Sequence, residues 1–118
     1  MKASVHPVVF FDIGCKDLEK NTSFYQNLFG WSATDIPFAN LIDTGTSDGI
    51  QGQITALGHE PRNYVMVYIQ VEDIDNHLEQ VVSEGGQKVI GPVTLPNGKQ
   101  FAWFKDPEGN MLGLVTKP

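Results

Sequence analysis

The most constraining feature of this sequence is an internal repeat with a constant spacing. Asp17-Leu18-Glu19 at position 17 recurs 56 residues later as Asp73-Ile74-Asp75, and Gly30 recurs at the same spacing as Gly86. Each motif follows an apolar run rich in strand-forming residues, at positions 8–13 and 64–71. Because the spacing is close to half of the 118 residues, the chain is predicted to contain two copies of one unit.

Each copy is predicted to contain one helix, over residues 17–29 and 73–84. Asp17 and Asp73 are suitable N-caps, and Gly30 and Gly85-Gly86 are suitable ends. In the second helix the apolar side recurs at i, i+3, i+4, i+7 and i+8, which is the spacing of one helix face. Its members are Ile74, His77, Leu78, Val81 and Val82.

Short strands are predicted around these helices. In the first copy they cover residues 8–13, 31–36, 40–43 and 51–57, and in the second copy residues 64–71, 88–93, 99–105 and 111–116. Two consecutive strand-helix-strand-strand-strand units predict an α+β fold whose helices cover one face of the sheet. We expect a single domain over residues 1–118, made of repeats at about 1–57 and 64–118, with a linker over 58–63.

Alternation along the strands predicts two different faces. In residues 64–71 one face is aliphatic, with Val65, Val67 and Ile69 expected beneath a helix. The opposite faces of the strands carry large and polar side chains that could line a pocket, the second side of a core, or a subunit interface. They are Phe10, Asp12, Tyr64, Met66, Tyr68, Phe101, Trp103 and Met111.

Composition excludes several classes of protein. Fourteen acidic and eight basic residues give a net charge of −6, which argues against a nucleic-acid binder. No apolar run approaches the roughly 18 residues of a membrane span, and residues 1–7 do not resemble a signal peptide. The single cysteine, Cys15, excludes an internal disulfide and fits a reducing compartment, so we expect a cytoplasmic protein.

Three ordered segments resemble the vicinal oxygen chelate superfamily, which includes glyoxalase I, bleomycin-binding proteins and extradiol dioxygenases. They are residues 8–31, residues 71–86, and the closing stretch 104–114 with its Asp106-Pro107-Glu108-Gly109-Asn110 turn. The resemblance covers nearly the whole chain. It implies paired βαβββ modules that form a cup-shaped mixed sheet, with the helices on its outer face, and a homodimer.

The resemblance also locates the metal ligands of metal-dependent members. The matching positions are Phe10, a glutamine at Gln53 or Gln51, Met66 and Gly113. Phe and Gly side chains cannot bind a divalent metal, Met is a poor ligand for hard cations, and a neutral amide is weak alone. We therefore expect no metal at the family position and no other cofactor.

Other candidate groups have simpler interpretations. Asp12 and Tyr68 are the candidates for acid–base chemistry. His6, His59 and His77 are not expected to converge, and His77 is read as a packing residue of the second helix. Cys15 is read as structural, and residues 45–49 lack the lysine and spacing of a phosphate-binding loop.

Three functions remain open from the sequence. The first is a small-molecule binding protein that holds an apolar or aromatic ligand in the cup without a metal. Its predicted ligand-binding residues are Phe10, Gln53, Tyr64, Met66, Tyr68, Phe101, Trp103, Met111 and Gly113. The second is a glyoxalase-related lyase, isomerase or dioxygenase-type enzyme with non-standard catalytic residues. The third is an interaction module whose cup is closed by its own side chains.

Overall fold

The computed structural model describes residues 5–57 and 61–117. Within them the chain forms two compact units, Phe10–Met66 and a second that joins the stretch up to Val9 to Val67–Pro118. The units divide between Val9 and Phe10 and between Met66 and Val67. Half of the predicted linker, residues 58–60, lies outside the described residues. No helix among the described residues is long and apolar enough to cross a membrane.

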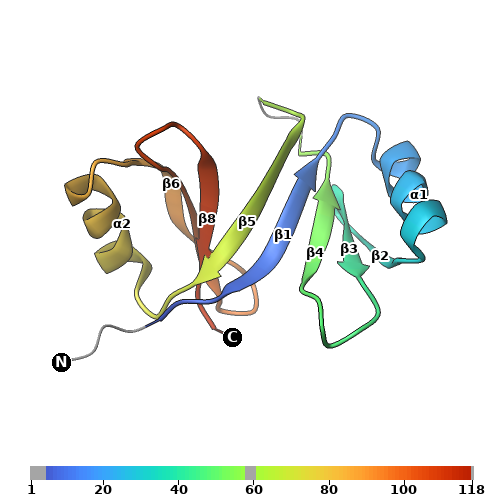
Figure 1. Ribbon diagram of the computed structural model, residues 1–118, viewed down its shortest axis with the longest axis horizontal. Helices are drawn as coiled ribbons and strands as arrows, with labels where there is room; N and C mark the ends of the chain where they lie inside the picture. The colour runs from blue at the N-terminus through green and yellow to red at the C-terminus, as the bar shows by residue number, and fades with distance from the viewer. Residues whose placement is uncertain (1–4, 58–60, 118) are drawn as a thin grey trace. The chain divides into compact units, whose positions relative to one another are not determined.

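The first βαβββ module contains β1 (Val8–Gly14), α1 (Leu18–Phe29), β2 (Ser32–Ile36), β3 (Ala39–Asp43) and β4 (Gln51–Thr55). Its strands lie in the order β2-β3-β4-β1, and β1 runs parallel to β4 while the other neighbours are antiparallel. Figure 1 shows α1 beside β2, β3 and β4. Asp17 caps the helix by accepting a hydrogen bond from the Lys20 amide, as the sequence predicts.

The second module repeats this topology with β5 (Tyr64–Gln70), α2 (Ile74–Ser83), β6 (Gln87–Thr94), β7 (Gln100–Lys105) and β8 (Met111–Val115). Its strand order is β5-β8-β7-β6, with β5 parallel to β8. Asp73 caps α2 through the Asn76 amide. The α+β class and the two βαβββ modules are thus confirmed, and the predicted bounds differ from the observed bounds by at most two residues.

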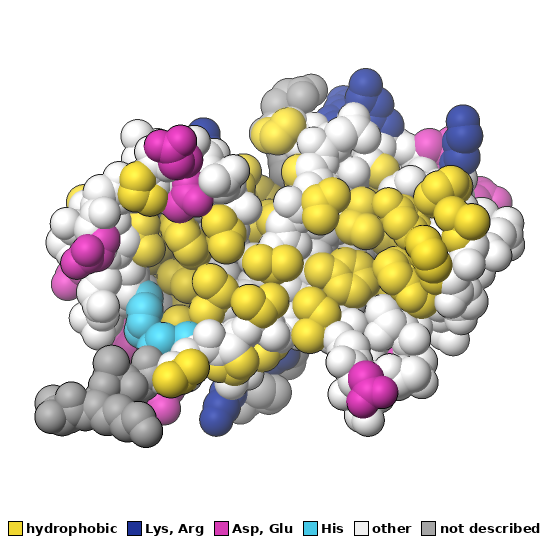
Figure 2. All heavy atoms as spheres, viewed as in Figure 1, with side chains coloured by type: hydrophobic (Ala, Val, Ile, Leu, Met, Phe, Trp, Pro, Cys, Tyr) yellow, Lys and Arg dark blue, Asp and Glu magenta, His cyan; other side chains and the backbone are white. Residues whose placement is uncertain are grey.

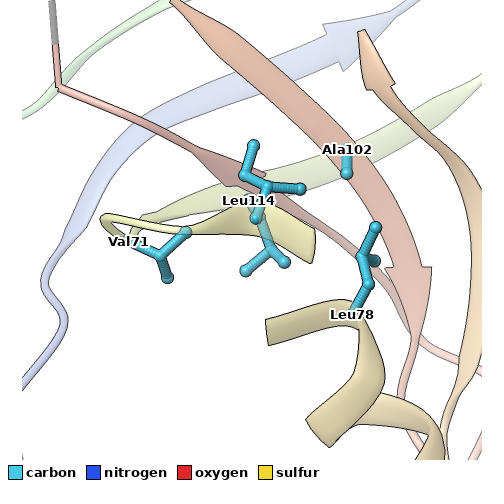
Figure 3. Close-up of a cluster of buried hydrophobic side chains, with 5 residues drawn as sticks. Val71, Leu78, Ala102 and Leu114 are labelled. Carbon is cyan, nitrogen blue, oxygen red and sulfur yellow. The ribbon is translucent and has the colours of Figure 1, made fainter. Parts of the chain in front are cut away.

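Each helix packs on the side of the strands that alternation predicted. Phe11 and Ile13 join the cluster around Cys15, Ile42 and Ile54 in the first module, together with Leu18 and Tyr25 of α1. In the second module the side chains of Val71, Leu78, Ala102 and Leu114 point toward one another, with Ile69 and Phe104 packed against them (Figure 3).

Of the three β5 residues predicted to be buried beneath a helix, Val67 and Ile69 are half-buried, and the prediction for Val65 is wrong. Val65 was expected beneath a helix, but 74% of its surface is exposed. The face on which it lies is still the predicted one, because Ile69 and Val71 point to the core beside α2. The reason is the extent of the helix: α2 packs mainly against β6 and β7, and Ile69 is the residue of β5 that packs against its cluster.

Candidate functional site

A buried carboxylate organises the face of the first module that points away from α1. Asp12 is 1% exposed. Gln53 Nε2 donates to Asp12 Oδ2 at 3.1 Å, and the Thr55 hydroxyl donates to Asp12 Oδ1 at 3.1 Å. The Tyr64 hydroxyl lies 3.4 Å from the same oxygen and 2.7 Å from the Thr55 hydroxyl. These four side chains, Asp12, Gln53, Thr55 and Tyr64, are called the Asp12 network below.

Strand register brings these residues together. The parallel pairing of β1 with β4 sets Asp12 beside Gln53, and Thr55 follows two residues later on the same face of β4. Gly14 then leaves room for the Tyr64 ring, because an added Cβ at Gly14 would lie 2.1 Å from a ring carbon. The network therefore depends on a close approach that only glycine allows.

The surroundings of Tyr64 favour its protonated state. Partial burial raises the pKa of Tyr64 to about 12, and the Asp12 carboxylate adds to this rise while the Thr55 hydrogen bond opposes it. The phenol therefore stays protonated well above neutral pH and can donate a hydrogen bond. A carboxylate acceptor beside a protonated phenol and a hydroxyl can orient a polar group or exchange a proton with one.

The equivalent face of the second module is aromatic. Trp103 Nε1 donates to the Tyr68 hydroxyl at 2.7 Å, and both side chains are buried. Tyr68 is paired with Gly113, and an added Cβ at Gly113 would lie 2.3 Å from a Tyr68 ring carbon. By repeat position, Tyr68 corresponds to Asp12 and Gly113 corresponds to Gln53.

The remaining predicted ligand-binding residues lie on these same two faces. Phe10, two residues before Asp12, is half-buried on the face of the Asp12 network, and Met66 is buried two residues after Tyr64. In the second module Phe101 and Met111 are half-buried on the face of Trp103 and Gly113. The structure thus assigns every predicted ligand-binding residue to the strand face away from its own helix.

The four positions that the resemblance matches to metal ligands carry a donor set that does not suit a divalent cation. Phe10 and Gly113 have no side-chain donor atom, and Met66 offers only a soft thioether. Gln53 is the repeat equivalent of Gly113, because their strand partners Asp12 and Tyr68 lie 56 residues apart. The amide nitrogen of Gln53 is bonded to Asp12. Gln51, whose register the sequence left open, accepts instead from the Thr44 amide at 2.6 Å. Within residues 5–57 and 61–117, no three His, Cys, Asp or Glu side chains gather as a metal site.

Sequence reasoning missed one member of the Asp12 network and the glycine beside it. Thr55 contacts both Asp12 and Tyr64, yet it reads as an ordinary residue near a strand end; its position two residues after Gln53 was the available signal. Gly14 was also missed, since nothing in a single sequence shows which glycine faces a ring. Cys15 is buried, and its thiol donates to the Thr55 carbonyl at 3.4 Å; burial raises the pKa of the thiol, which fits the predicted structural role.

Two surface cavities lie beside the helices. One, of about 260 Å³, lies between α2 and the end of β7 and includes Val81, Phe104 and Pro107. The other, of about 560 Å³, lies at the start of α1 and includes Lys16, Lys20 and Phe24. Neither is lined by the residues of the Asp12 network.

Comparison with known proteins places these features in a family. A sequence model of the Glyoxalase/Bleomycin resistance protein/Dioxygenase superfamily matches residues 5–114. A glyoxylase-like domain-containing protein of Didymella fabae is 28% identical, and the match covers 91% of each chain. The anthracycline biosynthesis protein DnrV of Streptomyces peucetius is 30% identical over 92% of this chain, which spans only 46% of that relative.

Solved structures agree on the fold. A methylmalonyl-CoA epimerase structure aligns over 99% of both chains with a TM-score of 0.69 at 16% identity. At that identity the likeness concerns the fold alone. Together with the two βαβββ modules, the sequence match over residues 5–114 shows that this chain belongs to the Glyoxalase/Bleomycin resistance protein/Dioxygenase superfamily.

Proposed function

We propose that this chain binds a small, partly aromatic molecule without a catalytic metal. The observation that carries the proposal is the packing of Tyr68 on Gly113. Metal-dependent relatives need a donor side chain at this position, and here the Tyr68 ring fills the space that any side chain would take. The chemistry of the other three positions, Phe10, Gln53 and Met66, supports the same conclusion.

The residues on the two faces indicate the class of ligand. Phe10 and Met66 are apolar neighbours of the Asp12 network, and Phe101 and Met111 lie half-buried on the aromatic face. Apolar walls with a few polar groups are typical of small-molecule sites. Either face by itself therefore suits an amphipathic ligand with an aromatic ring and a hydrogen-bonding group better than a highly charged one.

Tryptophan fluorescence provides a direct test, because the chain has two tryptophans in different surroundings. Trp103 lies on the proposed binding face, whereas Trp31 stacks on Tyr25 on the α1 side of the first module. In Trp31→Phe the only tryptophan left is Trp103, and its fluorescence should change when a hydrophobic dye or an anthracycline is added. Excess chelator should leave this change unaltered. In Trp103→Phe the response should vanish, and affinity should fall about tenfold or more. Equal binding by both variants, or binding that requires added metal, would contradict the proposal.

Elemental analysis tests separately the proposal that the protein holds no catalytic metal. Purified protein without an affinity tag should carry no stoichiometric metal that depends on Gln53 or Asp12. One equivalent of a transition metal that is lost in Gln53→Ala or Asp12→Asn would overturn the metal-free reading and favour a metal-dependent enzyme.

The Asp12 network supports a second candidate, a metal-free enzyme. A buried carboxylate beside a phenol whose pKa is about 12 combines a proton acceptor with a hydrogen-bond donor. Such a pair suits proton transfer next to a carbonyl group. Proton NMR in D₂O would detect exchange at the α-carbon of methylmalonyl-CoA, chosen as a probe because of the shared fold. Exchange that Asp12→Asn abolishes would favour the enzyme, and no exchange would favour the binding protein.

A further inference from the structure

The structure brings together two histidines that the sequence was not expected to place near each other. The ring centroids of His6 and His77 lie 4.7 Å apart, and the ring planes are nearly perpendicular at 86°. Both side chains are half-buried, and both belong to the unit that contains α2. Figure 2 shows the described histidines, in cyan, together at the surface. The expectation that the histidines do not converge is therefore wrong for this pair.

Backbone hydrogen bonds hold both residues in place. The carbonyl of Pro7, next to His6, accepts from the Gln70 amide of β5 at 2.9 Å. His77 lies near the start of α2, where its Nδ1 is 3.2 Å from the Asp73 carbonyl. A carbonyl can only accept, so Nδ1 carries the proton and Nε2 presents its lone pair. A ring N–H bonded to a carbonyl is the usual support of a metal-bound histidine.

We propose that His6 and His77 together bind one divalent transition-metal ion. A metal–nitrogen bond of about 2.1 Å puts each ring centroid roughly 3.2 Å from the ion, so two bound rings at 90–109° lie about 4.5–5.2 Å apart. The observed 4.7 Å falls within this range. Imidazole prefers zinc, nickel and copper, whereas magnesium and calcium prefer oxygen ligands. Water completes the coordination, since the described residues offer no third His, Cys, Asp or Glu.

Acidic residues close to His77 in the sequence offset the positive end of the α2 dipole, and a bound ion would join two segments of the chain. Glu72, Asp73 and Asp75 are exposed around the start of α2, and they add negative charge near His77. Binding at both imidazoles would tie the segment before β1 to α2. An ion that binds only the folded chain also stabilises that chain, in proportion to the logarithm of the ion concentration.

Calorimetric titration of tag-free protein with Ni²⁺ tests the site. Wild type should bind one equivalent, and His6→Gln and His77→Gln should each weaken binding at least about tenfold. His59→Gln is the matched control, because it removes the third histidine of the chain and should leave Ni²⁺ binding unchanged. Binding that survives both single variants, binding lost in His59→Gln, or no binding to wild type would each overturn the proposal.

Thermal unfolding provides a second readout that also separates this site from the family position. Ni²⁺ should raise the unfolding temperature of wild type and of Gln53→Ala, but not that of His6→Gln or His77→Gln. Mg²⁺ at the same concentration should have no such effect. A shift that depends on Gln53 instead of on the histidines would contradict this site and would also count against the metal-free function proposed above.

Discussion

Tyr64 shows how a single side chain depends on the protein around it. Its ring rests on Gly14 and its hydroxyl meets Thr55 and Asp12, so the neutral phenol is favoured over the phenolate. Desolvation is the largest cause, and the negative charge of Asp12 acts in the same direction. The pKa of Tyr64 is thus raised from 10.0 in a model peptide to about 12 in the folded chain.

This difference predicts a loss of stability at alkaline pH. Below pH 10.0 the phenol is protonated in both states, and the contribution of Tyr64 to folding is complete. As the pH rises toward about 12, the unfolded chain releases this proton first, so the free energy of unfolding falls. Urea unfolding across this range should show a smaller decline in Tyr64→Phe. A decline that is identical in the variant would show that Tyr64 is not its source.

Gly113 leaves room for a tyrosine ring in the same way as Gly14 does. An added Cβ there would lie 2.3 Å from the Tyr68 ring, so Gly113→Ala should lower the free energy of unfolding by about 1–3 kcal/mol. In a Tyr68→Ala background the same change should cost much less, because the ring that collides is gone. Urea unfolding of the four proteins would measure this coupling, and simple additivity of the two changes would contradict the close approach.

At the scale of elements, both helices begin with the same capping hydrogen bond, but they pack against their strands through different contacts. Asp17 and Asp73 each accept from the backbone amide three residues later. The helix α2 attaches through an aliphatic cluster, whereas α1 adds a buried polar contact: the Asn40 amide of β3 is hydrogen-bonded to the Thr22 hydroxyl at 2.8 Å. Thr22 is the one buried residue of α1, so this contact lies at the centre of its packing.

Replacing Thr22 by Val tests this attachment, because valine preserves the shape and removes the hydroxyl. The Asn40 amide would lose a buried partner, which should cost about 1–3 kcal/mol in the free energy of unfolding. Thr22→Ser keeps the hydroxyl and should cost less. Chemical denaturation would rank the two variants, and a less stable serine variant would show that the methyl group, not the hydrogen bond, dominates.

At the scale of the whole molecule, several large hydrophobic side chains lie at the surface. Phe24, Leu28 and Phe29 of α1 are each more than half exposed, as are Phe38 and Val65. Figure 2 shows hydrophobic side chains over much of the viewed face. Large exposed apolar patches commonly form protein–protein interfaces, and closed two-fold dimers are the commonest assemblies.

We therefore expect a homodimer. Light scattering at micromolar concentration should return a mass near twice 13.0 kDa, and the mass should persist at high salt because apolar contacts are not screened. A mass near 13.0 kDa at all concentrations would refute this expectation.

Much of this fold follows from the order of residues alone. The spacing of Asp17 and Asp73 predicts both helix starts, and alternation places Ile69 and Phe104 on the helix side of their strands. These features depend on contacts between near neighbours in the chain, whose periodicity is written directly in the sequence. The family resemblance follows for the same reason, since its motifs are local turns and caps.

Tertiary structure alone decided the contacts between distant segments. The register of β1 against β4 selected Gln53 as the partner of Asp12, the short reach of α2 left Val65 exposed, and the path of the chain before β1 brought His6 to His77. Local propensity does not encode such contacts, because they depend on how far one element extends and on which residues its neighbour presents there. A pairing between two strands or two rings is settled only when the whole set of packing constraints is satisfied together.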